Sequence, residues 1–268
     1  MDTRPIGIFD SGLGGLTVVK QISKMLPDES IVYFGDTGRV PYGTKSKETI
    51  TKYAKQDINF LNTFNVKMIV AACGTVSSVL TGVNSFSDVP YVRVIDSAAK
   101  CAAKSTKNKV VGLLGTAATV NSSTLKNLIL KQDSNIKVVQ NICSLFVPLV
   151  ESGWFKSDDI VVRETAKRYL APLIEAGCDT IVLGCTHYPV LAQVIGEIVG
   201  EDVKLINMGK TVAEYIKNYL TENDMLSDKK QENHFYVSDT PTSFEKTAEY
   251  LLQSNVEFDV KRVDIERY

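Results

Sequence analysis

Two cysteines stand at the ends of short apolar segments that resemble each other. Cys73 follows the apolar run Met68–Ala72, and Cys185 follows Thr180–Gly184. In both places the cysteine precedes hydroxyl-bearing residues and then sequence compatible with the start of a helix. The match is short, but the cysteine falls at the same position in each segment. We therefore expect two related halves of the chain, each carrying one thiol at the end of a strand.

A thiol at the start of a helix is suited to proton transfer. The helix dipole and its free N–H groups favour the thiolate by about 0.3–2 kcal/mol, which corresponds to a pKa lower by roughly 0.2–1.5 than the usual value of about 8.5. A thiolate and a thiol on opposite faces of one bound amino acid could remove the α-proton and return a proton to the other side. Such an exchange inverts the stereocentre.

The rival interpretation of any single cysteine is inert packing, because cysteine is among the most often buried residue types. The paired positions of Cys73 and Cys185 favour chemistry for these two. Inert packing remains the interpretation of the other three cysteines, Cys101, Cys143 and Cys178.

The composition is that of an ordinary globular protein. The chain has 268 residues, of which 44% are hydrophobic and 23% charged, so one large or two medium domains are expected. A net charge of −1 gives no electrostatic case for binding nucleic acid or an acidic membrane surface. The first apolar run, Ile6–Phe9, is too short for a signal peptide or a membrane span.

The cysteine and histidine content bears on redox state and metals. Five cysteines are an odd number and indicate reduced thiols in a cytoplasmic protein, not a disulfide framework. Their spacing forms no paired metal-binding motif, and the chain has only two histidines. We therefore expect no zinc site.

Apolar segments alternate with segments of helical spacing along the chain. Helices are expected over Leu16–Leu26, Glu48–Phe64 and Phe244–Gln253. Strands are expected over Ile6–Asp10, Ile31–Gly35, Met68–Ala72, Tyr91–Ile95, Lys109–Leu114, Lys137–Gln140, Thr180–Leu183 and His234–Val237. Such alternation favours an α/β fold with parallel sheets covered by helices on both faces. Ligand sites in these folds lie at the carboxyl ends of strands, where both thiols are predicted.

Four separated motifs, in this order along the chain, carry a family resemblance. They are the glycine-rich loop at residues 9–15, the segment 36–43, the segment 145–151 and the segment 184–189 that contains Cys185. Together they resemble the glutamate racemase family, within the aspartate/glutamate racemase superfamily, and the resemblance extends over nearly the whole chain.

The resemblance implies a fold of two similar α/β domains, with parallel-rich sheets flanked by helices and the active site in the interdomain cleft. It places the first domain at residues 1–97 plus 208–268 and the second at residues 98–207. The implied enzyme is an isomerase that interconverts L- and D-glutamate without pyridoxal phosphate or metal, supplying D-glutamate for peptidoglycan and hence for the cell wall and cell shape. Members of the family are often homodimers in the cytoplasm.

The resemblance also implies roles for individual residues. Cys73 and Cys185 correspond to the two acid/base thiols, Asp10 to the acid beside the first, and His187 and Glu151 to groups that assist the second. Contacts with the amino acid are implied for Ser11, Pro41, Tyr42, Gly43, Gly74, Thr75, Thr116, Thr119 and Thr186. From the residues alone, Asp10 could equally cap the following helix, Glu151 could be a solvated helix end, and Tyr42 could simply pack.

One position departs from the family pattern. Gly74 stands where the family usually has asparagine, and a buried amide contact to substrate is worth about 1–3 kcal/mol. Ser77 or Ser78 could replace that contact. Gly74 keeps open the racemisation of aspartate or another amino acid by the same chemistry. Two further alternatives are a thiol hydrolase that uses Cys185 and His187, and a protein that binds acidic amino acids without catalysis.

Overall fold

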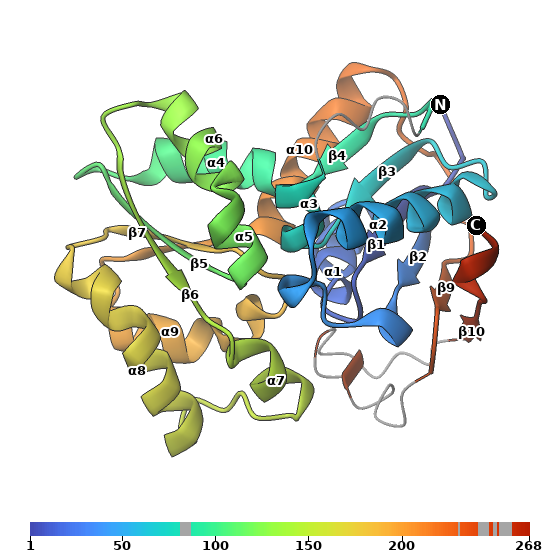
Figure 1. Ribbon diagram of the computed structural model, residues 1–268. Helices are drawn as coiled ribbons and strands as arrows, with labels where there is room; N and C mark the ends of the chain where they lie inside the picture. The colour runs from blue at the N-terminus through green and yellow to red at the C-terminus, as the bar shows by residue number, and fades with distance from the viewer. Residues whose placement is uncertain (81–86, 230, 241–246, 249–250, 252–258) are drawn as a thin grey trace.

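Two parallel β-sheets form the centres of two lobes (Figure 1). The computed structural model describes residues 1–80, 87–229, 231–240, 247–248, 251 and 259–268. Within them, the first sheet has the strand order β10-β9-β2-β1-β3-β4 and the second the order β6-β5-β7-β8. The first sheet comprises β1 (Ile6–Asp10), β2 (Ile31–Gly35), β3 (Met68–Ala71), β4 (Tyr91–Arg93), β9 (His234–Val237) and β10 (Val260–Arg262). The second comprises β5 (Val110–Gly115), β6 (Lys137–Ile142), β7 (Thr180–Leu183) and β8 (Lys204–Asn207).

The two sheets repeat one topology. The order β2-β1-β3-β4 in the first sheet matches β6-β5-β7-β8 in the second, and every pairing is parallel. By this correspondence β3, which precedes Cys73, is equivalent to β7, which precedes Cys185. The expectation of two halves with one thiol each is confirmed at the level of topology.

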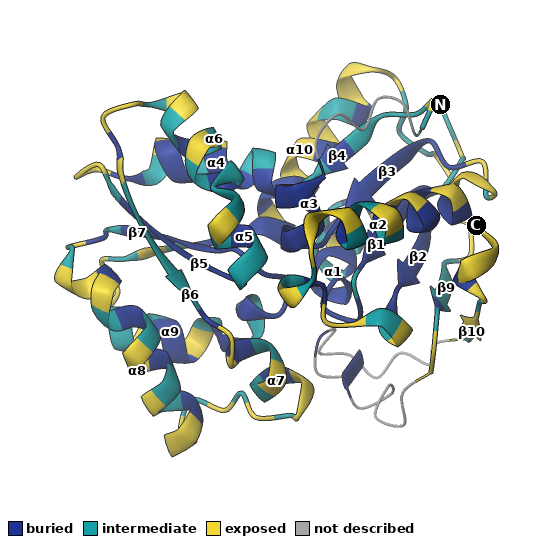
Figure 2. Ribbon diagram, viewed as in Figure 1, coloured by how far each residue is buried: buried dark blue, intermediate teal, exposed yellow. Residues whose placement is uncertain are grey.

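Helices cover both faces of each sheet. They are α1 (Leu16–Met25), α2 (Lys47–Asn62), α3 (Gly74–Val79), α4 (Val94–Ser105), α5 (Ala117–Ser122), α6 (Thr124–Gln132), α7 (Phe146–Glu151), α8 (Ile160–Glu175), α9 (Ala192–Val199) and α10 (Met208–Glu222). Successive strand side chains point to opposite faces, so Ile6 and Ile8 of β1 join the core on the α1 side and Phe9 joins the core on the α2 side. The strands of the first sheet's centre are therefore buried throughout, while α2 and α8 keep an exposed outer face (Figure 2).

Two helices join the lobes. α4 begins directly after β4 of the first sheet and packs against β7 and β8 of the second, and α10 packs against both α1 and α4. One hydrophobic cluster accordingly runs through both lobes, with Ile22 of α1, Ala99 of α4, Ile216 of α10 and Leu113 of β5 among its members. The strands of the two sheets lie within the two predicted domain ranges, and the predicted boundary at residue 97 falls inside α4. The domain bounds themselves stay a prediction.

Several elements differ from expectation. The strand predicted over Tyr91–Ile95 ends at Arg93, because Val94 and Ile95 bury their side chains from the first turn of α4. β8 and β10 were not predicted. Most of the helix predicted over Phe244–Gln253 lies outside the described residues. In the part of the chain that the structure describes, no helix combines the length and apolarity needed to cross a membrane.

Candidate active site

The carboxyl ends of four central strands meet where the two lobes touch. Asp10 ends β1, Cys73 follows β3, Thr116 follows β5 and Cys185 follows β7. Hydrogen bonds cross the junction here: among them, Thr75 Oγ1 lies 2.9 Å from Thr116 Oγ1, and the Thr186 hydroxyl lies 3.5 Å from Asp10 Oδ1. The candidate site is therefore interdomain, as predicted for parallel sheets whose ligands bind at strand ends.

Cys73 is a buried thiol beside a buried carboxylate. It is 5% exposed, it caps the N-terminus of α3, and its Sγ donates to Ser11 Oγ at 3.5 Å. Burial and the nearby charge of Asp10 raise the pKa of Cys73 to about 12, against the opposing effects of the Val76 N–H and Ser11. The expectation that the helix start would lower this pKa is wrong. Desolvation outweighs the field of a helix that is only six residues long.

Cys185 lies at one end of a row of three polar side chains. Its Sγ is 3.8 Å from His187 Nδ1, and His187 Nε2 is 3.2 Å from Glu151 Oε1. Burial opposes protonation of His187, but the contacts with Cys185 and Glu151 outweigh burial and raise its pKa to about 10. At neutral pH the imidazole is therefore a cation between a sulfur and a carboxylate. Glu151 is the last residue of α7, and its side chain is 43% exposed.

Asp10 connects the surroundings of the two thiols. Its side chain is fully buried, and it accepts from the Gly12 N–H at 3.2 Å and from the Thr186 hydroxyl of the other lobe. Burial raises the pKa of Asp10, while the charge of His187 lowers it. The Coulombic interaction with Cys185 also raises the pKa of Cys73, so the two thiols lie within electrostatic range of each other.

Hydroxyl groups from both lobes line the junction. Thr116 caps α5 by accepting from the Thr119 N–H, and its hydroxyl lies 3.0 Å from that of Thr119 and 2.9 Å from that of Thr75. Thr186 contacts Asp10, and Ser11 contacts Cys73. The structure thus brings together all five hydroxyl residues that the sequence singled out. Short neutral donors of this kind can bind carboxylates.

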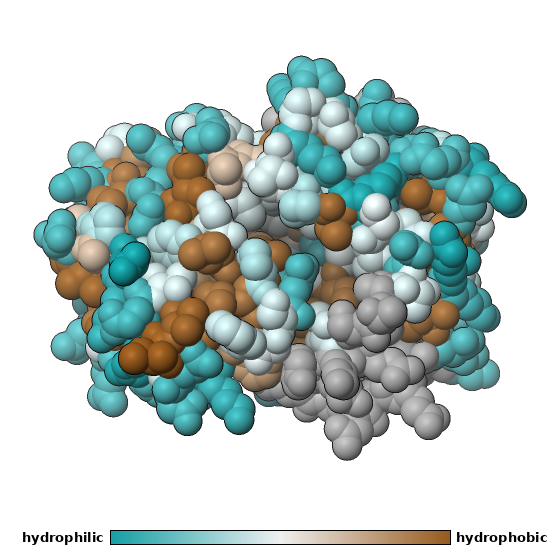
Figure 3. Space-filling view, turned by 60° about the horizontal axis from the view of Figure 1, so that its bottom comes forward, coloured by the Kyte–Doolittle hydropathy of each residue, from teal (hydrophilic) through white to brown (hydrophobic). Residues whose placement is uncertain are grey.

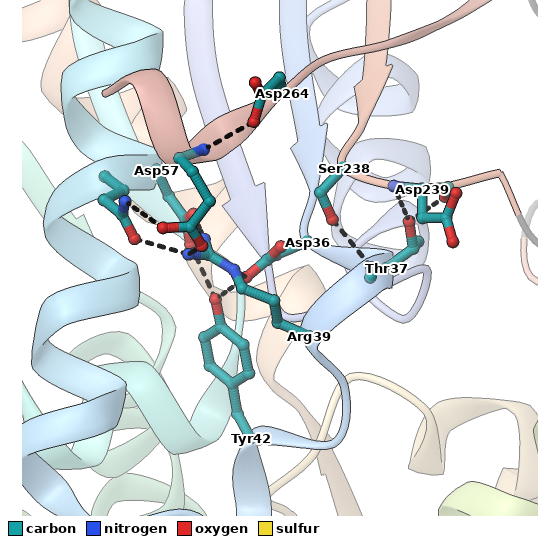
Figure 4. A network of polar contacts seen from close by, with 11 residues as sticks. Asp36, Thr37, Arg39, Tyr42, Asp57, Ser238, Asp239 and Asp264 are labelled. Carbon is teal, nitrogen blue, oxygen red and sulfur yellow. Dashed lines mark hydrogen bonds and ion pairs between the residues drawn. The ribbon is translucent and has the colours of Figure 1, made fainter.

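The segment after β2 meets the second lobe at Gly43. Gly43 lies against Thr116, since a Cβ on Gly43 would be 2.9 Å from Thr116 Cβ. Pro41 is exposed, and Tyr42 is buried with its hydroxyl turned to the carboxylates of Asp36 and Asp57 (Figure 4). The hydroxyl of Tyr42 therefore has partners other than a ligand.

A buried polar network holds this segment and was missed by the sequence reasoning. Arg39 Nε lies 2.6 Å from Asp36 Oδ2, and Arg39 Nη2 lies 3.2 Å from Asp57 Oδ1 (Figure 4). Burial first, and then the charge of Asp36, raise the pKa of Asp57, whereas Arg39 opposes that rise. Asp36 and Arg39 lie inside the second motif, which was the only sequence signal. Their partner Asp57 comes from the middle of α2.

The glycine-rich loop after β1 packs against the other lobe. A Cβ on Gly14 would lie 2.3 Å from Thr186 Oγ1 and 2.5 Å from His187 Nδ1, far inside normal contact. Only glycine permits this approach. Within this loop the Gly12 N–H donates to the carboxylate of Asp10.

A cavity opens between the lobes next to Gly43. Its volume is about 410 Å³, and its walls come from the segment after β2, from α3 and from α5. Lys45 and Lys47 line it, and none of the described residues that line it is acidic. Among the described residues, no group of three or more His, Cys, Asp or Glu side chains is placed to hold a metal ion.

Comparison with known proteins gives one family for nearly the whole chain. Residues 6–216 match the Asp/Glu/Hydantoin racemase family. The glutamate racemase of Thermoanaerobacter pseudethanolicus is 45% identical over 269 residues, covering 100% of both chains. That of Geobacter metallireducens is 43% identical and covers 99% of this chain and 98% of its own.

Solved structures agree with the sequence relatives. The glutamate racemase of Francisella tularensis, in complex with D-glutamate, is 38% identical, covers 100% of both chains and superposes with a TM-score of 0.92. A glutamate racemase isoform of Bacillus anthracis is 33% identical, covers 98% of both chains and gives a TM-score of 0.93. The aspartate racemase of Picrophilus torridus, at 20% identity and a TM-score of 0.56, shares the fold alone.

Proposed function

Because the chain belongs to the Asp/Glu/Hydantoin racemase family, we infer that it is an isomerase that interconverts L- and D-glutamate. Support comes from relatives that match over their full length and from a related structure that holds D-glutamate. The observation that carries the mechanism is the pair of buried cysteines, which follow equivalent strands of the two sheets and meet at one junction.

The proposed reaction moves one proton off the α-carbon and another onto it. The thiolate of one cysteine takes the α-proton, so a C–H bond breaks and an S–H bond forms. The other cysteine then donates its proton to the opposite face of the carbanion. Nothing is oxidised or reduced, and the roles of Cys73 and Cys185 exchange when the reaction runs in reverse. The two thiols carry the proton themselves, so the mechanism needs neither pyridoxal phosphate nor a metal.

The substrate's own charge helps to ionise the buried thiol. An ammonium group about 4 Å from Cys73 Sγ, at an effective dielectric constant of about 20, contributes about 4 kcal/mol, which corresponds to a pKa lower by about 3. This offsets most of the effect of burial on Cys73. On the other side, His187 holds a proton next to Cys185 and is itself held by Glu151. Asp10 lies where it can orient Cys73 or the ammonium group.

The substrate carboxylates have neutral partners in this proposal. Their hydrogen-bond donors are the hydroxyls of Ser11, Thr75, Thr116, Thr119 and Thr186. Gly43 and Gly74 contribute backbone, while Pro41 and Tyr42 shape the wall. The Thr75–Thr116 bond that closes the junction is exchanged for bonds to the substrate.

We also propose a cellular setting for the enzyme: a cytoplasmic homodimer that supplies D-glutamate for peptidoglycan. All five cysteines are free, which suits a reducing compartment. Large apolar side chains gather on the lobe of the second sheet (Figure 3), and Leu145, Trp154, Ile160 and Val161 are between 44% and 74% exposed. Exposed patches of this kind often mark subunit interfaces. Light scattering on the eluting protein measures the assembly.

Single serine substitutions test the two-thiol mechanism. We expect Cys73→Ser and Cys185→Ser each to reduce racemisation of L- and D-glutamate, followed by circular dichroism, more than 1000-fold, because an alcohol of pKa far above that of a thiol replaces one acid/base group. Each variant should still exchange the α-proton of one enantiomer with D2O. Cys101→Ser, outside the site, is the matched control and should retain wild-type activity and melting temperature.

The same assay separates the alternatives. Racemisation by either active-site variant at near wild-type rate would remove the two-thiol mechanism. Activity on aspartate with none on glutamate would overturn the substrate. A covalent adduct on Cys185 in mass spectrometry, with no change on losing Cys73, would favour a hydrolase.

A further inference from the structure

The two lobes touch through their backbones beside the thiols. A Cβ built on Gly74 would lie 2.4 Å from the carbonyl oxygen of Gly184 and 3.2 Å from Met208 Cε. Real Cβ atoms essentially never come within 3.0 Å of another heavy atom in this way. The methionine is flexible, but the Gly184 carbonyl belongs to a strand end. Even an alanine at residue 74 therefore requires the lobes to separate.

Each residue of this contact is the chain neighbour of one of the two thiols. Gly74 directly follows Cys73 and is the first residue of α3, and Gly184 directly precedes Cys185 at the end of β7. Both flanking residues are held by strands that are buried along their length. A displacement at Gly74–Gly184 is therefore passed to the separation of the two sulfur atoms.

Neighbouring contacts close the junction in the same manner. Gly14 meets Thr186 and His187, Gly43 meets Thr116, and the hydroxyl of Thr75, next to Gly74, is 2.9 Å from that of Thr116. Separating the lobes at Gly74 would stretch these contacts too. The closed junction depends on small residues of the first lobe that face the strand ends of the second.

We propose that Gly74 is a positioning residue: by allowing its backbone to meet that of Gly184, it sets the distance at which Cys73 and Cys185 face one amino acid. The inference rests on the proposed two-thiol function. In this proposal Gly74 has a positive role in the geometry of the site, and is more than a position that lacks the usual amide side chain. Ordinary contact begins at 3.4 Å, so a side chain at Gly74 must push the Gly184 carbonyl away by about 1 Å. A misplacement of about 1 Å in a reacting geometry can reduce the rate about 100-fold.

Two substitutions distinguish closure from a missing contact. Gly74→Ala removes no hydrogen bond, so a loss of rate in that variant reports the geometry. Gly74→Asn supplies the amide that the family usually has. If this position only lacked a substrate contact, Gly74→Asn would lower KM and leave kcat unchanged. If the position sets closure, both variants lose kcat.

The experiment measures turnover and thiol accessibility in the full-length enzyme. Racemisation of both glutamate enantiomers gives kcat and KM, and iodoacetamide followed by peptide mass spectrometry gives the alkylation rate of each cysteine. Gly196→Ala is the matched control, because a Cβ there meets nothing closer than Leu205 Cδ1 at 3.9 Å. Cys178 is buried just before β7, at the opposite end of that strand from Cys185, and acts as an internal reference.

We expect kcat to fall about 100-fold in both Gly74 variants. Iodoacetamide should alkylate Cys73 and Cys185 several-fold faster in these variants, with Cys178 unchanged and Gly196→Ala like wild type. A lower KM with wild-type kcat in Gly74→Asn overturns the proposal. Faster alkylation of all cysteines together also overturns it, because Gly74 would then support only the overall stability of the fold. A loss of kcat without faster alkylation of Cys73 and Cys185 overturns it as well. The alkylation pattern does not depend on turnover, so it tests the contact even if the two-thiol mechanism fails.

Discussion

Glu151→Gln tests whether the imidazole of His187 works as a cation. The substitution keeps the size of the side chain and removes the charge that faces His187 Nε2 at 3.2 Å. The contact with Cys185 at 3.8 Å is left in place. The variant therefore measures how much of the rise in the pKa of His187 is caused by the Glu151 carboxylate.

The magnitude follows from the geometry of the pair. At 3.2 Å and an effective dielectric constant of about 40, two unit charges attract by about 2.6 kcal/mol. Because the Glu151 side chain is 43% exposed, solvent screening lowers this to about 1–2 kcal/mol. At about 1.4 kcal/mol for each pKa unit, the pKa of His187 should fall by about one, from about 10 to about 9.

Stability gives a second measure with a defined pH window. The folded pKa of His187 lies above its unfolded value of 6.5, so its contribution is complete below pH 6.5 and is lost as the pH rises through about 10. The variant should be less stable than wild type by about 1–2 kcal/mol near pH 6, and the difference should shrink above pH 10, where the imidazole is neutral in both proteins.

The assay is imidazole NMR across pH, together with urea unfolding at pH 6, 8 and 10.5. The chain has only two histidines, so His234 supplies the second set of signals and the assignment is simple. A His187 pKa below 7 in the wild-type protein would refute the reasoning. A stability difference that is constant from pH 6 to pH 10.5 would show that Glu151 acts through packing and not through charge.

Two further outcomes follow from the network after β2. Arg39→Met leaves the buried carboxylates of Asp36 and Asp57 without their cation and should destabilise the fold by about 3–5 kcal/mol at pH 7 in urea unfolding. Loss of Arg39 raises the pKa of Asp57 further, so the deficit should shrink as the pH falls and this carboxyl takes up a proton in both proteins. A deficit that does not vary with pH would contradict the assignment. Tyr42→Phe removes the hydroxyl that donates to Asp36 and should lower the unfolding free energy by about 1–3 kcal/mol. Its kcat should change less than tenfold, and a larger loss would show that the hydroxyl serves the substrate.

The sequence was informative wherever the signal is local. An apolar run followed by a turn and a helix start is set by neighbouring residues, so the ends of β1, β3 and β7 could be predicted to within a residue, and with them Asp10, Cys73 and Cys185. Ser11 and Thr186, near two of these ends, lie inside the motifs. The exception at Tyr91–Ile95 arose because Val94 and Ile95 are equally apolar in a strand and in a buried helix turn.

Tertiary structure decided the properties that depend on distant groups. The local argument gave the wrong direction for the pKa of Cys73, because the desolvation that raises it comes from the packing of both lobes. The substrate contact that the resemblance implies for Tyr42 stays a prediction, and only the folded chain shows that its hydroxyl meets Asp57, which lies 15 residues away on α2. The contact between Gly74 and Gly184 joins residues far apart in the chain. A few consecutive residues determine where a strand ends and which side chains stand there. The burial of a group, its charged partners and the close approach of two backbones depend on residues distant in the sequence, which only folding brings together.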